Sequence, residues 1–400
     1  MTRYNFDKIT NRKGTNCLKY DFAVERGKPA DVLPLWVADM DFTVSEEITK
    51  SLHAAVEYGI YGYTQPKDAY YNAVMNWMER NHNWKTEREW IVKTPGVVFA
   101  LGAAVKAFTD PGDAILIQNP VYYPFTNIIR DNDRRVVDNT LIYEKTAGQS
   151  GDNGYRIDFE DFERKLEQEH IKLFILCNPH NPVGRVWTAE ELQQLGEICL
   201  RHHVIVVSDE IHNDFVYPGY EHTVFATVDP RFAEFTVTCT APSKTFNLAG
   251  LQISNIFIPN EKLRKAFQTE IDKTGYDEPN ALGIVACEAA YRAGEDWLDQ
   301  LRAYLLKNLN FLRNFLQEKI PQIHLVEPEG TYLVWLDCSE LGITGKELDQ
   351  FIVDKAGLWL DGGSMFGPSG AAFQRVNIAC PQATLELALN KLKAAVDNLE

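Results

Sequence analysis

The sequence predicts an α/β fold, with a large domain built on a mainly parallel sheet and a smaller α+β domain. Three observations lead to this prediction. From about Ile91 onward, helical and strand patterns alternate, and some strands are continuous apolar runs of the kind found in buried parallel sheets. After Glu278 the pattern changes to long amphipathic helices separated by short strands. The 400 residues are also more than one ordinary hydrophobic core requires.

The elements of the large domain follow one another in a regular order. Thr188, followed three residues later by Glu191, is a capping signal for the helix that ends at Leu200. The repeated strand, helix and strand favour parallel pairing. The predicted elements are helix 96–108, strand 114–118, helix 123–130, strand 172–177, helix 188–200, strand 204–207 and a strand near 235–239.

The second part of the chain reads as a smaller domain of mixed helices and strands. The first 45 residues or so hold little periodic structure, so we assign them to this domain as an arm. No internal repeat is found. We therefore predict a large domain of residues 46–290 and a small domain of residues 1–45 and 291–400. The predicted elements of the small domain are helix 295–318, strand 331–336, helix 346–355, strand 373–378 and a terminal helix.

Charge and cysteine content exclude several classes of protein. The 40 Lys and Arg residues and 56 Asp and Glu residues give a formal charge of −16, the wrong sign for neutralising a nucleic-acid backbone. The seven cysteines are odd in number and contain no C-x-x-C pair, so we expect free thiols and no zinc site. No apolar N-terminal segment and no run of about 18 apolar residues occurs. We expect a cytoplasmic protein with no nucleic-acid or membrane partner.

Polar residues directly follow three of the predicted strands. In parallel α/β sheets, ligands bind beyond the carboxyl ends of the strands, which lie at one edge of the sheet. We therefore expect an amide, a carboxylate and a lysine to converge in one pocket. The residues concerned are Asn181, Asp209, His212, Ser243 and Lys244.

This set of side chains suits pyridoxal 5′-phosphate. The cofactor needs a lysine that forms an imine, a carboxylate at the ring nitrogen, and hydrogen-bond donors at the phenolic oxygen. Asp209 would keep the ring nitrogen protonated, which lets the ring accept electrons from the substrate Cα. Lys244 would then be the base that removes the Cα proton.

The phosphate group of this cofactor requires backbone N–H groups at the start of a helix. Residues 94–98 open the predicted helix 96–108, so Gly96, Val97 and Val98 can supply such groups. The hydroxyl group of Ser243 would lie nearby.

Several motifs resemble, in order and spacing, those of the class I and II aminotransferases, which have pyridoxal-phosphate fold type I. They are residues 181–184 (NPVG), Asp209 with His212, residues 243–250 (SKTFNLAG) and residues 375–379 (RVNIA). The resemblance spans most of the chain and implies a mainly parallel, seven-stranded sheet flanked by helices. Other motifs are similar to those of the cystathionine β-lyase (C–S lyase) subgroup: FD at 6–7, NR at 11–12, GT at 14–15, LWVADMDF at 35–42 and YGY at 61–63.

The resemblance implies a role for each candidate residue. Lys244 forms the imine with the cofactor, and Asp209 pairs with the ring nitrogen. Asn181 and His212 lie near the phenolic oxygen, and Tyr122 stacks on the ring. Taken singly, these residues have simpler interpretations, such as a surface lysine, a helix cap, a turn residue or a packed tyrosine. Their joint spacing favours the site.

The resemblance also implies an active site shared between two subunits of a homodimer. Tyr63 reaches the cofactor phosphate of the neighbouring subunit. Arg375, together with Asn181 and the backbone near Ala38, binds the carboxylate of an amino-acid substrate. An inward-facing arginine on a strand needs an anionic partner, and a substrate carboxylate can accept two of its hydrogen bonds.

Two positions depart from the family pattern. Many relatives have an arginine eight residues after the lysine, where Gln252 stands, and a serine three residues before it, where Ala241 stands. Phosphate binding must therefore depend more on the helix start and on the tyrosine. Gln252 also fits the lyase subgroup better than ordinary aminotransferases.

We predict a C–S β-lyase that cleaves cystathionine or a related S-substituted L-cysteine to a thiol, pyruvate and ammonia. Lys244 would remove the Cα proton, and Lys244 or a tyrosine, Tyr63 or Tyr122, would protonate the departing thiolate. An aminotransferase that uses the same lysine stays open as an alternative, as does a cofactor-binding regulator that contacts another protein. Motifs for other chemistries, including G-x-x-x-x-G-K, H-E-x-x-H and G-x-S-x-G, do not occur in the sequence, and no metal site is predicted.

Overall fold

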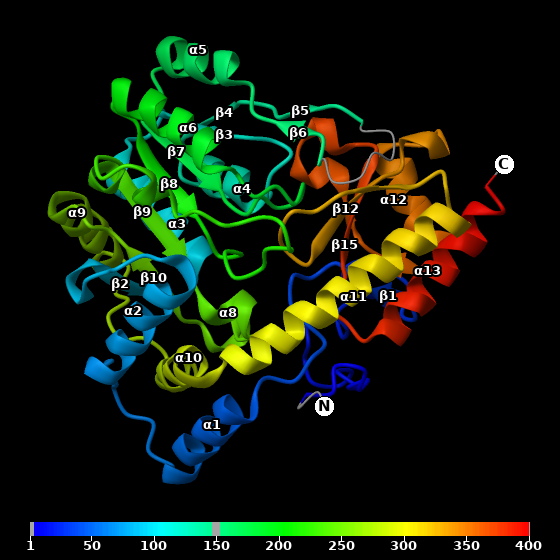
Figure 1. Ribbon diagram of the computed structural model, residues 1–400, viewed down its shortest axis with the longest axis horizontal. Helices are drawn as coiled ribbons and strands as arrows, with labels where there is room; N and C mark the ends of the chain where they lie inside the picture. Colours follow the sequence, from blue (N-terminus) through cyan, green and yellow to red (C-terminus); the bar gives the residue numbers. More distant parts are fainter. Residues whose placement is uncertain (1–3, 146–152, 400) are drawn as a thin grey trace.

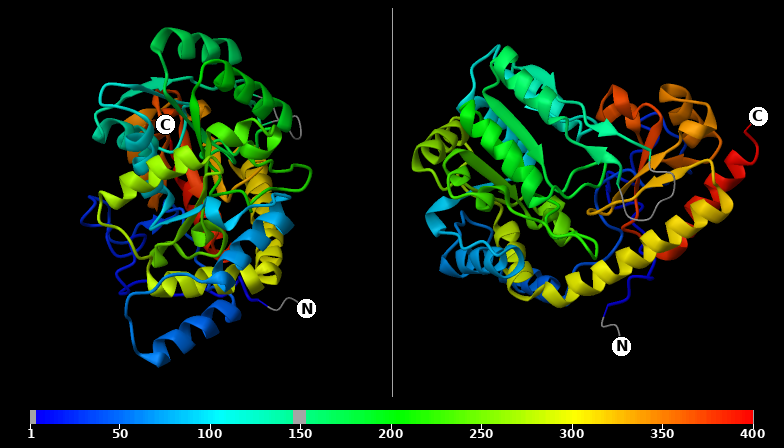
Figure 2. Two further views of the ribbon diagram at one scale, coloured as in Figure 1. Left: turned by 90° about the vertical axis from the view of Figure 1, so that its left-hand side faces the viewer. Right: turned by 45° about the horizontal axis from the view of Figure 1, so that its top comes forward.

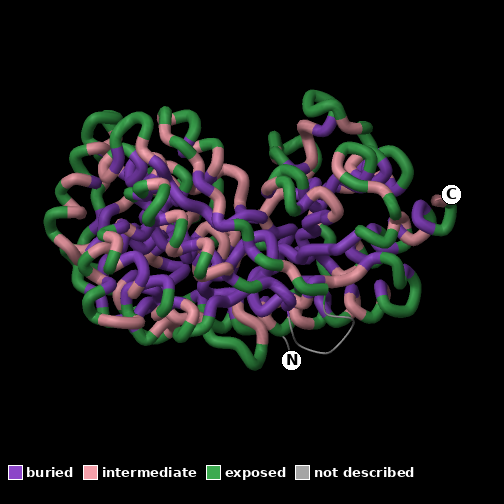
Figure 3. The backbone as a smooth tube through the Cα atoms, turned by 90° about the horizontal axis from the view of Figure 1, so that it is seen from above, coloured by how far each residue is buried: buried purple, intermediate pink, exposed green. Residues whose placement is uncertain are grey.

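The computed structural model describes residues 4–145 and 153–399. The chain forms two parts that lie side by side, one built on a seven-stranded sheet and the other on a four-stranded sheet (Figure 1). Buried residues run through the middle of both parts and between them, and exposed residues lie on the outside (Figure 3).

The seven-stranded sheet is mainly parallel, as predicted. The five strands from β9 to β4 run parallel to one another, and β10 runs antiparallel to both β9 and β2. Strands β3, β7 and β9 are buried along their whole length, which accounts for their continuous apolar or small-residue sequences. The order across the sheet is β2 (Ile91–Thr94), β10 (Ser254–Phe257), β9 (Thr236–Thr240), β8 (Ile205–Asp209), β7 (Leu173–Cys177), β3 (Ala114–Ile117) and β4 (Arg135–Asp138).

Helices cover both faces of this sheet (Figure 2). Alternate residues of β3 show why: Ile115 and Ile117 belong to one apolar cluster and Leu116 belongs to the other. The first cluster includes residues of α3 (Val97–Phe108), α4 (Pro124–Asp131) and α9 (Glu261–Asp272). The second includes residues of α5 (Phe159–Glu169), α6 (Ala189–Arg201) and α7 (Phe225–Val228).

The start of α6 confirms the capping signal in the sequence. The backbone N–H of Glu191 donates to Thr188 Oγ1 at 3.2 Å, and the N–H of Thr188 donates to Glu191 Oε2 at 2.9 Å. Two N–H groups that the first turn leaves without helical partners are thereby satisfied.

The smaller part consists of an antiparallel sheet and three helices. Helix α11 (Glu295–Lys319) is long and passes from beside the large sheet to the small one, where it lies next to α13 (Figure 1). The strand order is β11 (His324–Val326), β12 (Leu333–Asp337), β15 (Phe373–Asn377) and β14 (Asp361–Gly362). The other two helices are α12 (Gly345–Asp354) and α13 (Gln382–Val396).

The N-terminal arm is attached to the smaller part. Strand β1 (Leu33–Pro34) pairs in parallel with β13 (Leu358–Trp359), and Trp36 stacks on Trp359 with 4.4 Å between the ring centroids. This pairing supports the grouping of residues 1–45 with residues 291–400, although the domain boundaries stay a prediction. Within the described ranges, no helix has the length and apolar character needed to cross a membrane. The remaining elements include α1 (Glu46–Tyr58), α2 (Asp68–His82), α8 (Pro242–Thr245), α10 (Ala281–Ala293), β5 (Ile142–Tyr143) and β6 (Tyr155–Arg156).

Candidate active site

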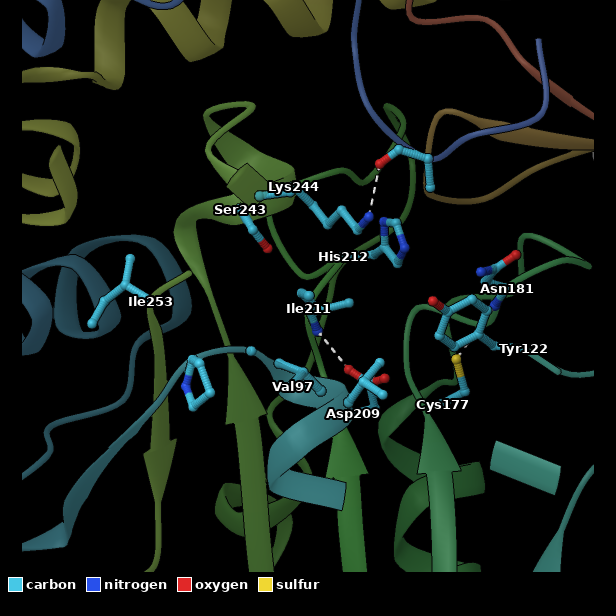
Figure 4. Close-up of a pocket in the computed structure, with 15 residues that line it drawn as sticks. Val97, Tyr122, Cys177, Asn181, Asp209, Ile211, His212, Ser243, Lys244 and Ile253 are labelled. Atoms are coloured by element: carbon cyan, nitrogen blue, oxygen red, sulfur yellow. Dashed lines mark hydrogen bonds between the residues drawn. The ribbon is translucent and has the colours of Figure 1, made fainter. Parts of the chain in front are cut away.

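The predicted site residues gather beyond the carboxyl ends of β7, β8 and β9. A pocket lies at this edge of the sheet, beside the start of α3 (Figure 4). Every predicted site residue except Tyr63 and Arg375 lines it. The lining consists of Ala38, Pro95, Gly96, Val97, Val98, Tyr122, Cys177, Asn181, Asp209, Ile211, His212, Ser243, Lys244, Ala249 and Ile253.

Lys244 lies in α8, the single helical turn that follows β9. Its Nζ atom donates a hydrogen bond of 2.7 Å to the carbonyl oxygen of Ala38. Burial, and then the positive charge of Arg375, lower the pKa of Lys244 from 10.5 to about 8. The amine is therefore partly neutral near neutral pH, as a nucleophile or a base must be.

Asp209, the last residue of β8, enters the pocket from the side opposite Lys244 (Figure 4). Its side chain is 4% exposed and accepts a hydrogen bond of 3.2 Å from the backbone N–H of Ile211. Burial raises the pKa of Asp209 to about 7. A cation placed beside this carboxylate would stabilise its charged form.

Three further predicted residues line the pocket around these two groups. His212 is buried, and its Nδ1 atom has no hydrogen-bond partner among the residues that the structure describes. Burial, and then the charges of Lys244 and Arg375, hold the pKa of His212 well below its usual value, so the ring is neutral. Tyr122 and Asn181 lie together across the pocket from Ser243 (Figure 4). Burial raises the pKa of Tyr122, which keeps the phenol protonated.

The start of α3 forms the wall next to Ser243. Thr94 holds the turn before this helix, because its Oγ1 atom donates to the carbonyl oxygen of Gly96 at 3.1 Å and lies 2.6 Å from Ser254 Oγ. The first N–H groups of a helix have no partners within the helix, and here they belong to residues that line the pocket. An anion can bind at this position.

Arg375 lies behind the pocket on β15 and is buried. It donates from Nη1 to Asn181 Oδ1 at 3.0 Å and from Nη2 to the carbonyl oxygen of Trp36 at 2.8 Å. Asp361, which the sequence reasoning did not select, forms an ion pair with Nη2. The anionic partner that an inward-facing arginine needs is thus present within the chain.

Tyr63 lies away from the pocket of its own chain. Its side chain is 94% exposed, and it borders a surface depression formed with residues 278–282. Within one chain it cannot contribute to the site. Its role stays a prediction that requires a second subunit.

A segment of the N-terminal arm, residues 36–42, passes beside Lys244; we call it the strap. Side chains from three distant parts of the chain hold its backbone, and Arg12 and Lys19 form ion pairs with its aspartates, Asp39 and Asp41. The strap is therefore held through both its backbone and its side chains. Its hydrogen bonds join Asn377 Nδ2 to the oxygens of Val37 and Asp39 (2.6 Å each), Asn247 Nδ2 to those of Met40 and Phe42 (3.0 Å each), and Tyr332 Oη to that of Ala38 (3.2 Å).

Asp214 anchors the turn that carries Lys244. Its buried carboxylate accepts a hydrogen bond of 2.6 Å from the hydroxyl of Thr245, the residue after Lys244. Trp77 donates to the same carboxylate at 3.2 Å, and His82 Nε2 lies 3.0 Å from it. The carbonyl oxygen of Asp214 accepts a further bond of 2.7 Å from Arg302 Nε, on α11.

The sequence reasoning missed Tyr332, Asp361 and Asp214. Tyr332 immediately precedes β12, so the search for polar residues that follow strands does not reach it. Asp361 lies in a strand of two residues, which leaves no periodic signal. Asp214 could have been predicted from the sequence, because it follows Asp209 and His212 in a segment that was already selected.

Comparison with known proteins gives the family. The profile described as "Aminotransferase class I and II" matches residues 30–392. The chain belongs to this family. Cystathionine beta-lyase PatB of Bacillus subtilis is 46% identical over 392 residues, which is 98% of this chain and 100% of that protein.

Two solved structures of this kind superpose closely. Cystalysin from Treponema denticola, which contains a pyridoxal 5′-phosphate cofactor, has a TM-score of 0.94 and 37% identity, and the match covers 99% of this chain and 100% of that one. A pyridoxal-phosphate-bound C–S lyase from Staphylococcus hominis has a TM-score of 0.91 and 35% identity, with 98% of each chain covered. The family and fold type expected from the sequence are confirmed.

Proposed function

We propose that this protein is a pyridoxal-phosphate-dependent C–S β-lyase that cleaves cystathionine or a related S-substituted L-cysteine to a thiol, pyruvate and ammonia. The observation that carries the proposal is the convergence of Lys244, Asp209 and Asn181 in one pocket of a chain that is similar along almost its whole length to proteins named cystathionine beta-lyase and C–S lyase. The substrate is an amino acid.

The pocket fits pyridoxal 5′-phosphate in its chemistry. Asp209 is a buried carboxylate without a cationic hydrogen-bond partner among the described residues, and a protonated ring nitrogen would supply one. His212, whose Nδ1 atom has no partner among the described residues, lines the same pocket. Lys244 would hold the cofactor covalently, and the start of α3 with Ser243 would hold its phosphate. The cofactor, once bound, accepts the electron pair that the substrate Cα keeps when it loses its proton.

The side chains of the pocket then bind the substrate and move protons. Arg375 and Asn181 hold the substrate carboxylate, which fixes Cα near Nζ of Lys244. Lys244 removes the Cα proton, and its lowered pKa suits it to this task at neutral pH. Tyr122 packs on the cofactor ring, and its protonated phenol can donate to the departing sulfur, as can the Lys244 ammonium group. Loss of the thiol leaves an unsaturated amino acid, which water converts to pyruvate and ammonia.

The active protein is a homodimer with shared sites. Large apolar side chains are exposed at the end of α1 and in the loop that follows it, where a second subunit would cover them. Tyr63 would thereby reach the cofactor phosphate of the partner chain. The exposed residues are Val56 (50%), Tyr58 (74%), Ile60 (69%), Tyr61 (61%) and Tyr63 (94%).

The protein works in the cytoplasm. All seven cysteines are free and only Cys17 is not buried, which suits a reducing compartment. Localisation of the tagged protein by cell fractionation tests this part of the proposal.

The test of the function is an assay of the purified holoprotein with L-cystathionine and no added keto acid. Pyruvate and free thiol should be released continuously and in equal amounts, while the cofactor spectrum returns to its starting form. If the cofactor instead converts once to its amine form and returns to its starting form only when a keto acid is added, the protein is an aminotransferase.

A further inference from the structure

Asp361 and Arg375 form a buried ion pair between adjacent strands of the smaller sheet. Strands β14 and β15 are antiparallel, and these two residues lie opposite each other. Both side chains are only 3% exposed. Over the described part of the chain, Arg375 is the cation paired with the Asp361 carboxylate. A buried carboxylate of this kind depends on its cation, because burial of an unpaired charge costs several kcal/mol.

The pair occupies the position on Arg375 that a substrate carboxylate needs. A carboxylate that accepts two hydrogen bonds from arginine binds along one of two edges, formed by Nε with Nη2 or by Nη1 with Nη2. Both edges include Nη2. The two protons of Nη2 are already used by Asp361 and by the carbonyl oxygen of Trp36, at 2.8 Å.

Asp361 is the group that can give way. The carbonyl of Trp36 is held in place, because the neighbouring Leu35 donates its N–H to the carbonyl oxygen of Trp359 and accepts from the N–H of Asn377, both at 2.9 Å. Asn181, which accepts from Nη1, is neutral and does not repel an anion. A second carboxylate at Nη2 would repel Asp361 in a buried site where charges are poorly screened.

We propose that Asp361 is an internal placeholder for the substrate carboxylate, which neutralises Arg375 between turnovers and is displaced from Nη2 when substrate binds. This inference rests on the proposed role of Arg375 as the carboxylate anchor. Substrate affinity then depends on how much more strongly Arg375 binds the substrate carboxylate than it binds Asp361. It does not reflect the full strength of one arginine–carboxylate contact. The product keeps the same carboxylate, so the return of Asp361 assists its release.

The test uses propionate, a carboxylate that cannot react, and its uncharged analogue propionamide. Their dissociation constants for the holoprotein are measured by calorimetry for wild type, Asp361→Asn and Asp349→Asn. Asp349 is the matched control, because it is a nearby carboxylate that binds Gln374 Nε2 at 2.7 Å and makes no contact with Arg375. In Asp361→Asn, propionate should bind about tenfold more tightly or better, since hydrogen bonds to charged groups have this strength. Propionamide binding, and both affinities in Asp349→Asn, should not change.

Two further variants separate the possible failures. If Arg375→Gln loses propionate binding while Asp361→Asn leaves it unchanged, Arg375 is the anchor and the placeholder is refuted. If Arg375→Gln binds propionate as tightly as wild type does, Arg375 is not the carboxylate anchor and the inference is refuted. The lyase function is tested separately, by pyruvate release from cystathionine. If Asp361→Asn does not fold, Asp361→Ser replaces it, and we expect the same tighter binding of propionate and unchanged binding of propionamide.

Discussion

Nζ of Lys244 lies 2.7 Å from the carbonyl oxygen of Ala38, although the two residues are 206 positions apart in the sequence. The hydrogen bond joins the helical turn after β9 to the strap of the N-terminal arm. Because a carbonyl oxygen can only accept, the amine donates one of its protons here. The strap therefore lines the pocket through Ala38 and also contacts Lys244, the residue that we propose carries the chemistry.

Replacement of Lys244 by alanine should abolish turnover. No other group in the pocket lining is an amine, so neither the covalent attachment of the cofactor nor removal of the Cα proton can proceed. Pyruvate release and the visible absorbance of the bound cofactor measure the two effects. Lys262→Ala, an exposed lysine on α9, is the matched control and should behave as wild type. Retention of activity and absorbance by Lys244→Ala would remove the basis for the lysine assignment.

The lowered pKa of Lys244 predicts how the apoprotein takes up its cofactor at different pH values. Only the neutral amine attacks the aldehyde, and an amine is neutral above its pKa. With a pKa of about 8 in place of 10.5, the rate should rise up to about pH 8 and then level off. Stopped-flow absorbance between about pH 6 and pH 10 measures this rate, with a lysine peptide of ordinary pKa as reference. A protein rate that kept rising in step with the peptide would contradict the expectation.

Loss of the Asn377 side chain should weaken substrate binding. This side chain donates to the carbonyl oxygens of Val37 and Asp39, on either side of Ala38, so its removal loosens the strap next to Ala38. For Asn377→Ala we expect KM for cystathionine to rise about tenfold, which corresponds to about 1.4 kcal/mol, within the range of one or two buried hydrogen bonds.

Asn139→Ala is the matched control for this variant. Asn139 is also buried and also donates two hydrogen bonds, to the carbonyl oxygen of Asp158 at 3.0 Å and to Asp161 Oδ2 at 2.9 Å, but neither it nor these partners belong to the strap. It should lose a similar amount of stability in urea unfolding and keep KM near the wild-type value. Equal changes in KM for both variants would show that the strap has no special part in binding.

Replacement of Asp214 by asparagine should loosen the turn that carries Lys244. The amide keeps one acceptor oxygen and replaces the other by a donor. It therefore cannot serve both Trp77 and His82, which meet Oδ1 of Asp214, and Thr245, which donates to Oδ2. We expect the free energy of unfolding to fall by about 1–3 kcal/mol, together with weaker cofactor binding. Thr245→Val, which removes a single donor, should cost about 1 kcal/mol. Urea unfolding and cofactor titration measure both effects, and an unchanged Asp214→Asn variant would mean that the anchor is unnecessary.

The sequence allowed prediction of those strands that are buried on both faces and apolar in composition. Strand β7, with the sequence LFILC, is such a case. Strand β10 was missed because it begins with Ser254 and Asn255, which break the apolar run. Both are buried, but their partners, Thr94 and Tyr70, lie about 160 and 185 residues away. No local sequence pattern can indicate that such buried polar side chains will find hydrogen-bond partners. Edge strand β4, with the sequence RVVD, has two apolar residues between two charged ones and gives a weaker signal still.

Site residues could be predicted where they directly follow a strand. They were missed where their position depends on how distant segments of the chain pair with one another. Residues after parallel strands, such as Asp209 and Lys244, share one edge of a sheet because of the topology alone. Asp361 contacts Arg375 because two antiparallel strands are in one particular register, which is fixed by the packing of the smaller sheet. Tyr63 stays a prediction, since the packing of a second chain decides where its ring lies.

Helix α11 holds the backbone behind both ends of the proposed substrate site. Arg302 on this helix holds the backbone of Asp214, beside the Lys244 turn, and Asn308 holds the backbone just beyond the strand of Arg375. The two residues are six positions apart, so they are separated by roughly 9 Å along a helix that rises 1.5 Å per residue and does not stretch easily. The helix therefore ties the turn that carries Lys244, the proposed base, to the strand that carries Arg375, the proposed carboxylate anchor, at a fixed spacing.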